Sequence, residues 1–275
     1  ALIAKFFFKN TYFTGGIDDL DENHASPKRY AIQKLFFSLC YWASKFCIIV
    51  SESDKQNILK FFHRRNLRKL SYSEHTIDVV NFLRTTVVHK DKIFTTIVWM
   101  GNEGNVKRKG IDTALRVFST LREQRQFCDY KFVIIGKTGE GTSYVKNLIN
   151  EYGLQNAVTL TGEISEDEKI QLLFKSKYYF QLSIYEGFGL AALEALAAKD
   201  IVIHSGRGGL ANPIFSSGIY FDISNDWRME MNNLLNRLST YDERQLESMS
   251  KHILQYYDNS RRKNDFLQII SELNN

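Results

Sequence analysis

The chain has 275 residues, of which 44% are apolar and 24% charged, and its formal net charge is +5. This is an ordinary globular balance, with apolar material for one large domain or two modest ones. No apolar run reaches the roughly 18 residues that a membrane span needs, and Cys40, Cys47 and Cys128 lack the spacing of a disulfide framework or a zinc site. These features argue against membrane-spanning and disulfide-rich classes and favour a cytoplasmic protein.

The first 92 residues form an irregular α/β segment. A helix is expected near residues 30–44, followed by the strand "FCIIV" and by a helix in "SESDKQNILKFF" with Ser51 as its N-cap. These elements make up about half of an α/β unit, which is short for a Rossmann domain of roughly 100–150 residues. The hinge to the next domain is expected near residues 73–92.

Positive charge is concentrated in this N-terminal part. Residues 1–95 hold 15 Lys and Arg against 9 Asp and Glu, a balance of +6, and much of the excess lies in "KFFHRRNLRK", Lys60–Lys69. A solvated helix end is the simplest interpretation. The alternative is a patch that contacts anionic lipid at the inner face of the membrane, or a polyanionic acceptor. Nucleic acid is not expected, because no recognised binding motif accompanies the patch.

From residue 93 to about 245, short apolar strands alternate with helical segments. Strands are expected in "IFTTIVWM", "KFVIIG", "AVTLTG", "YYFQLSI" and "DIVIHS". Helical spacing of apolar residues runs from Ile111 to Leu121, and the helix in "SEDEKIQLLFKSK" opens with the capping-box pair Ser165 and Glu168. The alternation predicts a parallel, doubly wound sheet of the Rossmann type.

Two helical stretches are expected in residues 246–275, packing back toward the N-terminal part. The last begins near Ser260 and is expected to bury Phe266, Ile269 and Ile270. The predicted organisation is therefore a partial α/β segment in 1–92, a Rossmann-like domain in 93–245 and the closing helices.

Two glutamates stand out in "YEGFGLAALEALAA", which begins at Tyr185. Glu186 follows the strand "YYFQLSI", at the strand end where ligands bind in open α/β sheets. The glycines at 187 and 189 let the backbone approach a ligand at the N-terminus of the next helix, which suits phosphate. Alone, this pattern is equally typical of a tight strand-to-helix turn with a solvated Glu.

Glu194 lies on that helix, about 40° from Leu190 and at the edge of the apolar face that Leu190 forms with Leu193 and Ala197. Burying an unpaired carboxylate costs several kcal/mol. A partner must therefore donate hydrogen bonds to Glu194, and sugar hydroxyls, a backbone N–H or a Lys would each serve.

The stretch "SIYEGFGLAALEALA" resembles the E-x7-E motif of family-4 glycosyltransferases of the GT-B fold. Similar motifs surround it in the family's order: "VWMGNEGNVKRKGIDTAL", "FVIIGKTGEG", "AVTLTGEIS" and "GRGGL". The resemblance covers residues 93–238, and "CIIVSESDKQNIL" resembles the end of the family's N-terminal domain. It implies a GT-B fold with a complete C-terminal donor domain and a partial N-terminal, acceptor-side domain.

The resemblance also implies a function: metal-independent, retaining transfer of a sugar from a UDP- or GDP-linked donor to a glycan or lipid-linked acceptor, as in polysaccharide biosynthesis, without a cofactor. Glu186 would contact the donor sugar, Glu194 the ribose and Lys109 the leaving diphosphate, whose developing charge fixed cations stabilise. Backbone amides around Phe188, Gly189 and Leu190 would hold the diphosphate. The remaining nucleotide-sugar contacts are expected from Gly187, Arg108, Gly136 and Ile164.

Three features depart from the family pattern. Asn102 stands where the family often has Arg, so Lys107 or Arg108 would supply the second positive charge. Asn212 stands where a Glu is usual, and the first half of the N-terminal domain is not found. The chain is then cut short, unusual on its acceptor side, or completed by another polypeptide. A non-catalytic GT-B-like subunit is the alternative function, and a dehydrogenase is disfavoured because no G-x-G-x-x-G opens the first helix.

Overall fold

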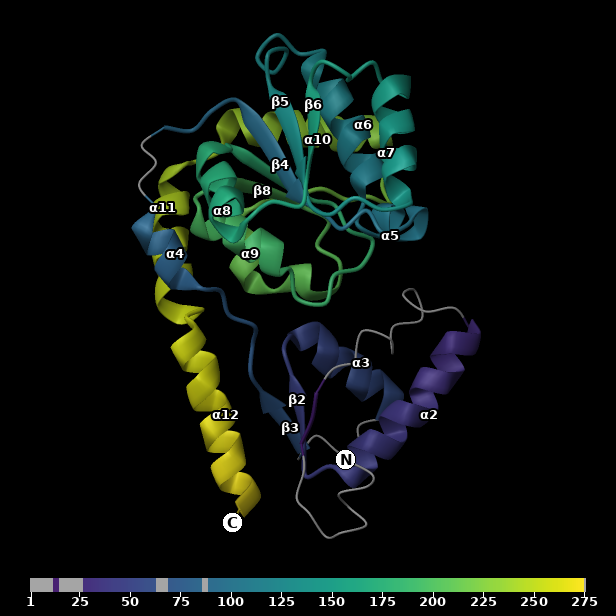
Figure 1. The fold of residues 1–275 in the computed structure, drawn as a ribbon, viewed down its shortest axis with the longest axis vertical. Coiled ribbons are helices and arrows are strands. Elements are labelled where there is room, and N and C mark those ends of the chain that lie inside the picture. The colour runs from purple at the N-terminus through teal and green to yellow at the C-terminus, as the bar shows by residue number, and fades with distance from the viewer. Residues whose placement is uncertain (1–11, 15–26, 63–68, 86–88, 275) are drawn as a thin grey trace. The chain divides into compact units, whose positions relative to one another are not determined.

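The computed structural model describes residues 12–14, 27–62, 69–85 and 89–274. The chain divides into unit 1, residues 1–76 with 257–275, and unit 2, residues 77–256. This division places the boundaries after residues 76 and 256, whereas the sequence prediction places them after 92 and 245. Each unit is described by itself (Figure 1).

Unit 1 contains a three-stranded parallel sheet in the order β1-β2-β3. Its strands are Tyr12–Thr14, Phe46–Ile49 and Leu70–Tyr72, and its helices are α2 (Pro27–Ala43), α3 (Glu52–Phe62) and α12 (Asn259–Asn274). Ser51 is the N-cap of α3, as predicted. Its Oγ accepts a hydrogen bond from the Asp54 amide at 3.1 Å. In α12, Ile269 is buried, but Ile270 is 42% exposed, so the predicted burial of Ile270 is wrong.

Most of the basic segment Lys60–Lys69 lies outside the described residues. Lys69 itself is described, and its Nζ donates to the carbonyl oxygens of Tyr41 at 3.0 Å and Ser44 at 2.8 Å. A cation at the carboxyl end of a helix pairs with the last carbonyls of α2. This lysine therefore stabilises a helix end.

Unit 2 is built on a six-stranded parallel sheet in the order β6-β5-β4-β7-β8-β9. The strands are β4 (Ile93–Ile97), β5 (Lys131–Ile135), β6 (Val158–Gly162), β7 (Tyr178–Gln181), β8 (Ile201–His204) and β9 (Ile219–Tyr220). Counted from β4, this is the 3-2-1-4-5-6 order of a Rossmann sheet, whose switch point lies between the first and fourth strands. The predicted doubly wound α/β sheet is confirmed, with its switch point between β4 and β7.

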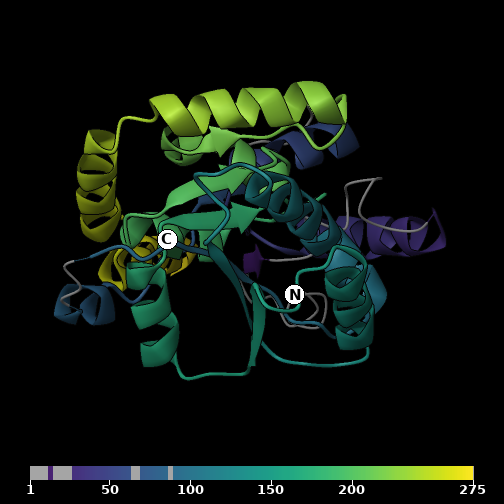
Figure 2. The same ribbon diagram turned by 90° about the horizontal axis from the view of Figure 1, so that it is seen from above.

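Helices cover both faces of this sheet (Figures 1 and 2). The helices of unit 2 are α4 (Val79–Arg84), α5 (Glu103–Arg108), α6 (Ile111–Arg122), α7 (Gly141–Glu151), α8 (Glu166–Lys175), α9 (Leu190–Ala197), α10 (Trp227–Thr240) and α11 (Arg244–Tyr256), with 3-10 turns at Gly208–Ala211 and Pro213–Ser217. The predicted capping box of α8 is present: Ser165 Oγ accepts from the Glu168 amide and the Glu168 carboxylate accepts from the Ser165 amide.

The core of unit 2 lies between the sheet and the layer of α6, α7 and α10. Phe94 of β4 is fully buried at its centre and stacks on Phe180 and Tyr178 with ring centroids 5.0 and 4.6 Å apart. Such packing makes the sheet a rigid base for the loops at its carboxyl edge. Within the described residues, no helix is both long and apolar enough to cross a membrane.

Candidate functional site

The loops that follow β4 and β7 pack closely against each other at the switch point. Gly110, with φ of +67°, is the reason: a Cβ there would lie 1.9 Å from the carbonyl oxygen of Leu182. The Ile184 amide donates to the Arg108 carbonyl at 2.8 Å and joins the two loops again. Only glycine fits such a close backbone approach in this conformation. The contact brings Lys109, which directly precedes Gly110, next to the loop that contains Glu186.

Lys109 and Glu186 form an ion pair at this place. Lys109 Nζ lies 2.6 Å from Glu186 Oε2, and the two side chains are 23% and 15% exposed. The same oxygen accepts from Gln181 Nε2 at 3.0 Å and from Ser183 Oγ at 3.3 Å. Within the described residues, no hydrogen bond reaches Oε1. One carboxylate oxygen is thus held in place while the other can accept a hydrogen bond from a ligand.

A series of hydrogen bonds between buried groups fixes the orientation of the Gln181 side chain. Tyr179 Oη accepts from the Ile97 amide at 3.1 Å and donates to Gln181 Oε1 at 3.3 Å, so the Gln181 amide presents its nitrogen to Glu186. Burial raises the pKa of Tyr179, which keeps its hydroxyl neutral and able to donate. Sequence reasoning missed Tyr179, Gln181 and Ser183. The available signal was polar groups at every second position of an otherwise apolar buried strand.

The loop from Glu186 to Gly189 rests on the predicted glycine pair. A Cβ at Gly208 would lie 2.2 Å from the Glu186 carbonyl oxygen, and one at Gly209 would lie 2.3 Å from the Gly187 carbonyl oxygen. The Gly209 amide donates to the Glu186 carbonyl at 2.6 Å. The two glycines therefore let the backbone of this loop lie directly on the segment after β8.

Helix α9 begins immediately after this loop. Gly189, with φ of +95°, precedes its first residue, and the first amides of a helix have no partner within the helix. Phe188 is buried, whereas Leu190 is 39% exposed, so Leu190 does not share the buried face of Leu193 and Ala197 that the helical wheel predicts. The N-terminus of α9 thus opens at the same sheet edge as Glu186 and carries a partial positive charge.

Glu194 has a lysine as its partner, one of the three alternatives left open by the sequence. Lys169 Nζ of α8 lies 3.0 Å from Glu194 Oε1 and 2.6 Å from Glu166 Oε2. Burial raises the pKa of Glu194, and Lys169 opposes this only in part. Burial lowers the pKa of Lys169, but its two carboxylate neighbours outweigh that effect and raise it. The carboxylate on the apolar edge of α9 is therefore compensated within the fold.

The residues that depart from the family pattern have structural roles. Asn102 Oδ1 accepts from the Asn105 amide at 2.8 Å at the N-terminus of α5, and Asn212 Oδ1 accepts from the Ile214 amide at 3.0 Å at the start of a 3-10 turn. Both are N-caps, positions that favour Asn.

The two basic residues of α5 point to different places. Lys107 pairs with Glu103 at 2.6 Å on the helix surface. Arg108 donates to Asn105 Oδ1 at 2.7 Å and faces the Tyr185 carbonyl oxygen at 3.5 Å, next to Glu186. Of the two alternatives, Arg108 is the residue on the side of the site.

Gly136 and Ile164 lie further along the same sheet edge. Gly136 follows β5, and a Cβ there would lie 2.1 Å from the Val98 carbonyl oxygen. Ile164 follows β6 and is half-buried. No described hydrogen bond links either residue to the Lys109–Glu186 pair. In the part of the chain that the structure describes, no group of three or more His, Cys, Asp or Glu side chains could hold a metal ion.

A Rossmann sheet with an ion pair and an open helix N-terminus at its switch point is an arrangement typical of α/β proteins that bind nucleotides. Comparisons with known proteins show which proteins of this kind the chain is similar to. Residues 103–219 match the family model described as glycosyl transferases group 1. This segment contains both Lys109 and Glu186, as well as Glu194.

Curated relatives include glycosyltransferases of archaea and bacteria. The chain is 32% identical over 132 residues to an uncharacterized glycosyltransferase of Methanocaldococcus jannaschii, covering 48% of this chain and 32% of that protein. It is 30% identical over 111 residues to the GDP-mannose:cellobiosyl-diphosphopolyprenol alpha-mannosyltransferase of Xanthomonas oryzae, covering 40% of this chain and 28% of that protein. The chain spans about a third of the length of the curated relatives that it matches.

Solved structures of glycosyltransferases share the fold. Anabaena HepE in complex with UDP and glucose has a TM-score of 0.77 at 13% identity, with 98% of this chain and 74% of that chain covered. Sucrose-phosphate synthase of Thermosynechococcus elongatus has a TM-score of 0.76 at 18% identity, with 95% and 67% covered. The chain has the α/β fold of GT-B glycosyltransferases, and its segment 103–219 is similar to glycosyl transferases group 1.

Proposed function

We propose that this chain contributes the donor site of a retaining glycosyltransferase that moves a sugar from a UDP- or GDP-linked donor to a glycan or lipid-linked acceptor. The observation that carries the proposal is the Lys109–Glu186 pair, held at the switch point beside the N-terminus of α9. The comparisons are consistent with it: HepE is in complex with UDP and glucose, and the Xanthomonas relative is named for GDP-mannose. The assignment to family 4 and its E-x7-E motif is part of the same proposal.

In this proposal each group has a role. The diphosphate binds at the N-terminus of α9, where the amides around Phe188, Gly189 and Leu190 face it. Lys109 and Arg108 stabilise the charge that develops on the leaving oxygen as the sugar–phosphate bond breaks. No metal ion takes part in this scheme, because these residues supply the positive charge.

Glu186 orients the donor sugar through Oε1. Its Oε2 is already bound by Lys109, Gln181 and Ser183, an arrangement that fits a positioning carboxylate better than a nucleophile. The acceptor then attacks from the face that the phosphate leaves, which gives retention. Glu194 binds the ribose through Oε2, with Oε1 held by Lys169, while Gly187, Gly136 and Ile164 complete the nucleotide-sugar contacts.

Calorimetry with UDP- and GDP-sugars and an assay of donor hydrolysis test the proposal together. We expect Lys109→Met to lower turnover about 10²- to 10³-fold, the usual effect of removing one group that stabilises a developing oxyanion. Lys107→Met is the matched control, because it removes a neighbouring cation that pairs with Glu103 on the surface. Equal rates for the two variants, or no binding of any donor, would contradict the proposal.

A non-catalytic subunit that depends on a partner chain is the second candidate. It is favoured by Asn102 and Asn212, which act as helix caps where charged residues are usual in the family. If the chain binds a donor in calorimetry but neither hydrolyses it nor transfers its sugar to any acceptor tested, this candidate is favoured over the enzyme.

Peripheral contact with the inner face of an anionic membrane, through the segment Lys60–Lys69, is a separate proposal that would place the protein in the cytoplasm. More protein is expected to float with anionic vesicles than with neutral ones, because basic side chains are attracted to anionic lipid. The assay is run at low salt because salt screens this attraction. Equal flotation would remove it.

A further inference from the structure

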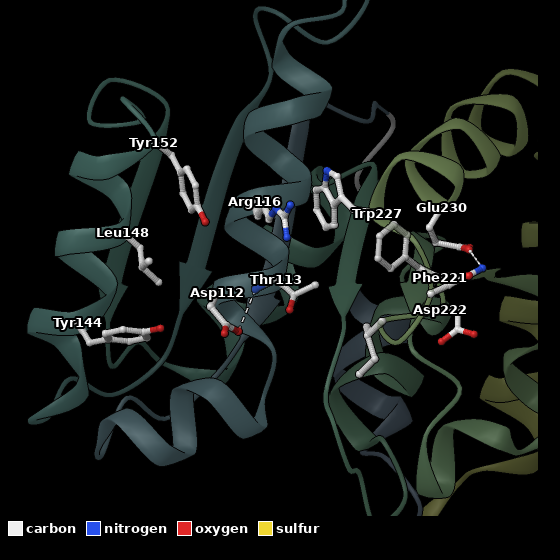
Figure 3. A pocket seen from close by; sticks show the side chains of 12 residues that line it. Asp112, Thr113, Arg116, Tyr144, Leu148, Tyr152, Phe221, Asp222, Trp227 and Glu230 are labelled. Carbon is white, nitrogen blue, oxygen red and sulfur yellow. Dashed lines mark hydrogen bonds between the residues drawn. The ribbon is translucent and has the colours of Figure 1, made fainter.

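Unit 2 carries a groove that the proposed donor site does not use (Figure 3). It has a volume of about 260 Å³ and is lined by α6, α7 and the segment from Phe221 to Glu230, which leads from β9 into α10. None of the residues assigned to the donor site lines it. The groove is thus a concave surface of unit 2 that lies apart from the Lys109–Glu186 pair.

Aromatic side chains form two sides of this groove. Tyr144 projects from α7 and Tyr152 from the position directly after it, both half-buried, and Trp227 lies on the α10 side of Arg116 (Figure 3). Trp227 is held by an edge contact with Phe221 at 6.0 Å and by the Arg116 guanidinium, 3.9 Å from its ring centroid. The Trp227 ring is therefore fixed by packing, and the two tyrosines add apolar ring surface next to polar hydroxyls.

Charged groups of both signs line the groove: Asp112 and Arg116 lie between the tyrosines and Trp227, and Asp222 and Glu230 lie on the far side of Trp227 (Figure 3). Asp112, Asp222 and Glu230 contribute three carboxylates and Arg116 one guanidinium, and the Arg207 guanidinium lies 3.6 Å from Asp222, so the formal net charge is −1. Glu230 is only 5% exposed, yet within the described residues it forms no ion pair and accepts one hydrogen bond, from Asn225 Nδ2 at 3.1 Å. Glu230 is thus held by Asn225, whereas Asp112, which lies between the tyrosines and Trp227 in Figure 3, accepts from the Thr113 amide on Oδ1 only; within the described residues no hydrogen bond reaches its Oδ2, which can accept from a ligand that brings donors.

The chemistry of the groove selects among ligand classes. A phosphate or nucleotide would be repelled by the excess of carboxylates. The carboxylates do not converge as a metal-binding group, and Arg116 opposes a simple cation. A sugar ring satisfies all the groups: its hydroxyls donate to carboxylates and accept from a guanidinium, and its C–H faces pack on tyrosine rings. The volume lies below the roughly 300–1,000 Å³ of drug-sized sites, which suits one ring.

We propose that this groove binds one pyranose unit of a neutral glycan at a site separate from the donor site. The proposal does not depend on the transfer reaction, because the groove and the Lys109–Glu186 pair share no residue. It gives the protein a second place to hold a glycan chain.

Saturation-transfer NMR with the methyl α- and β-glycosides of glucose, galactose, mannose and N-acetylglucosamine tests the proposal on the full chain. We expect at least one glycoside to bind, and an excess of UDP to leave its signal unchanged. Absence of a signal from every glycoside, displacement by UDP, or preferential binding of spermidine would overturn it.

Two variants place the binding in the groove. Tyr152→Ala removes a ring, and Asp112→Asn removes a charge while keeping the oxygen that accepts from the Thr113 amide at 2.9 Å. We expect each to weaken the glycoside about tenfold, as for loss of a hydrogen bond to a charged group. Asn147→Ala, at an exposed position of α7, is the control and should bind normally. Unchanged affinity in folded Asp112→Asn would contradict the site.

Discussion

Replacing Lys169 by methionine tests how the fold compensates Glu194. The ammonium group that lies 3.0 Å from Glu194 Oε1 is lost, while the length of the side chain is kept. Lys169 and Glu194 are 13% and 19% exposed, so the pair is largely buried. Breaking a fully buried pair costs about 3–5 kcal/mol. Because water still reaches both groups here, we expect the free energy of unfolding to fall by about 2–3 kcal/mol at pH 8.

The loss should depend on pH with a definite sign. Burial already holds the pKa of Glu194 above its ordinary value, and removing Lys169 raises it further. The folded variant then binds a proton more tightly than the unfolded chain, so its stability falls as the pH rises. The deficit should be largest above the folded pKa and should disappear below about pH 4, the pKa of Glu in an unfolded chain.

Urea unfolding at several pH values between 4 and 8, followed by circular dichroism, measures these effects. Glu166→Gln is the matched control. It removes the other carboxylate that pairs with Lys169, and the Glu166 side chain is 73% exposed. An exposed pair contributes about 0.2–1 kcal/mol. The double variant Lys169→Met/Glu194→Gln should recover part of the loss. If Lys169→Met costs no more than the control, or the same at every pH, the reasoning is wrong.

Two further predictions concern backbone and buried charge. Gly110→Ala should destabilise unit 2 by well over the ~1–2 kcal/mol of a left-handed residue, because its Cβ meets the Leu182 carbonyl oxygen. Gly153→Ala, with a similar φ of +64° but open space around it, should cost only that amount; equal urea midpoints would refute the steric argument. Asp200 is fully buried, and burial raises its pKa to about 7 despite Lys90 at 2.6 Å. Stability should therefore fall as the pH rises from 5 to 8, and an unchanged slope in Asp200→Asn would contradict the assignment.

Much of the site was predictable because its motifs are local. The glycines at 110, 208 and 209 mark backbone approaches that only glycine permits, and the spacing of Glu186 and Glu194 places one before a helix and one on it. The parallel sheet also follows from the alternation of strands and helices. The assignment to family 4, the retaining chemistry and the residue roles stay predictions.

Other parts of the site depended on contacts between distant segments. Nothing in the sequence around Lys169 indicates that it pairs with Glu194, 25 positions away, because the packing of α8 against α9 decides it. The orientation of Arg108 toward the site and of Lys107 away from it follows from the turn of α5. The exposure of Leu190 also depends on tertiary structure, because this residue is in the first turn of α9, at the carboxyl edge of the sheet.

The sequence by itself determined the order of elements, the glycine turns and the presence of two acids around a helix start, because hydrophobic period and backbone conformation are local properties. Only the tertiary structure decided which groups surround each acid. Glu186 is bound on one oxygen by Lys109, Gln181 and Ser183, and Glu194 is compensated by a lysine from a neighbouring helix. The physical reason is that a buried charge takes its partner from whichever element packs against it, and sequence spacing does not encode that choice.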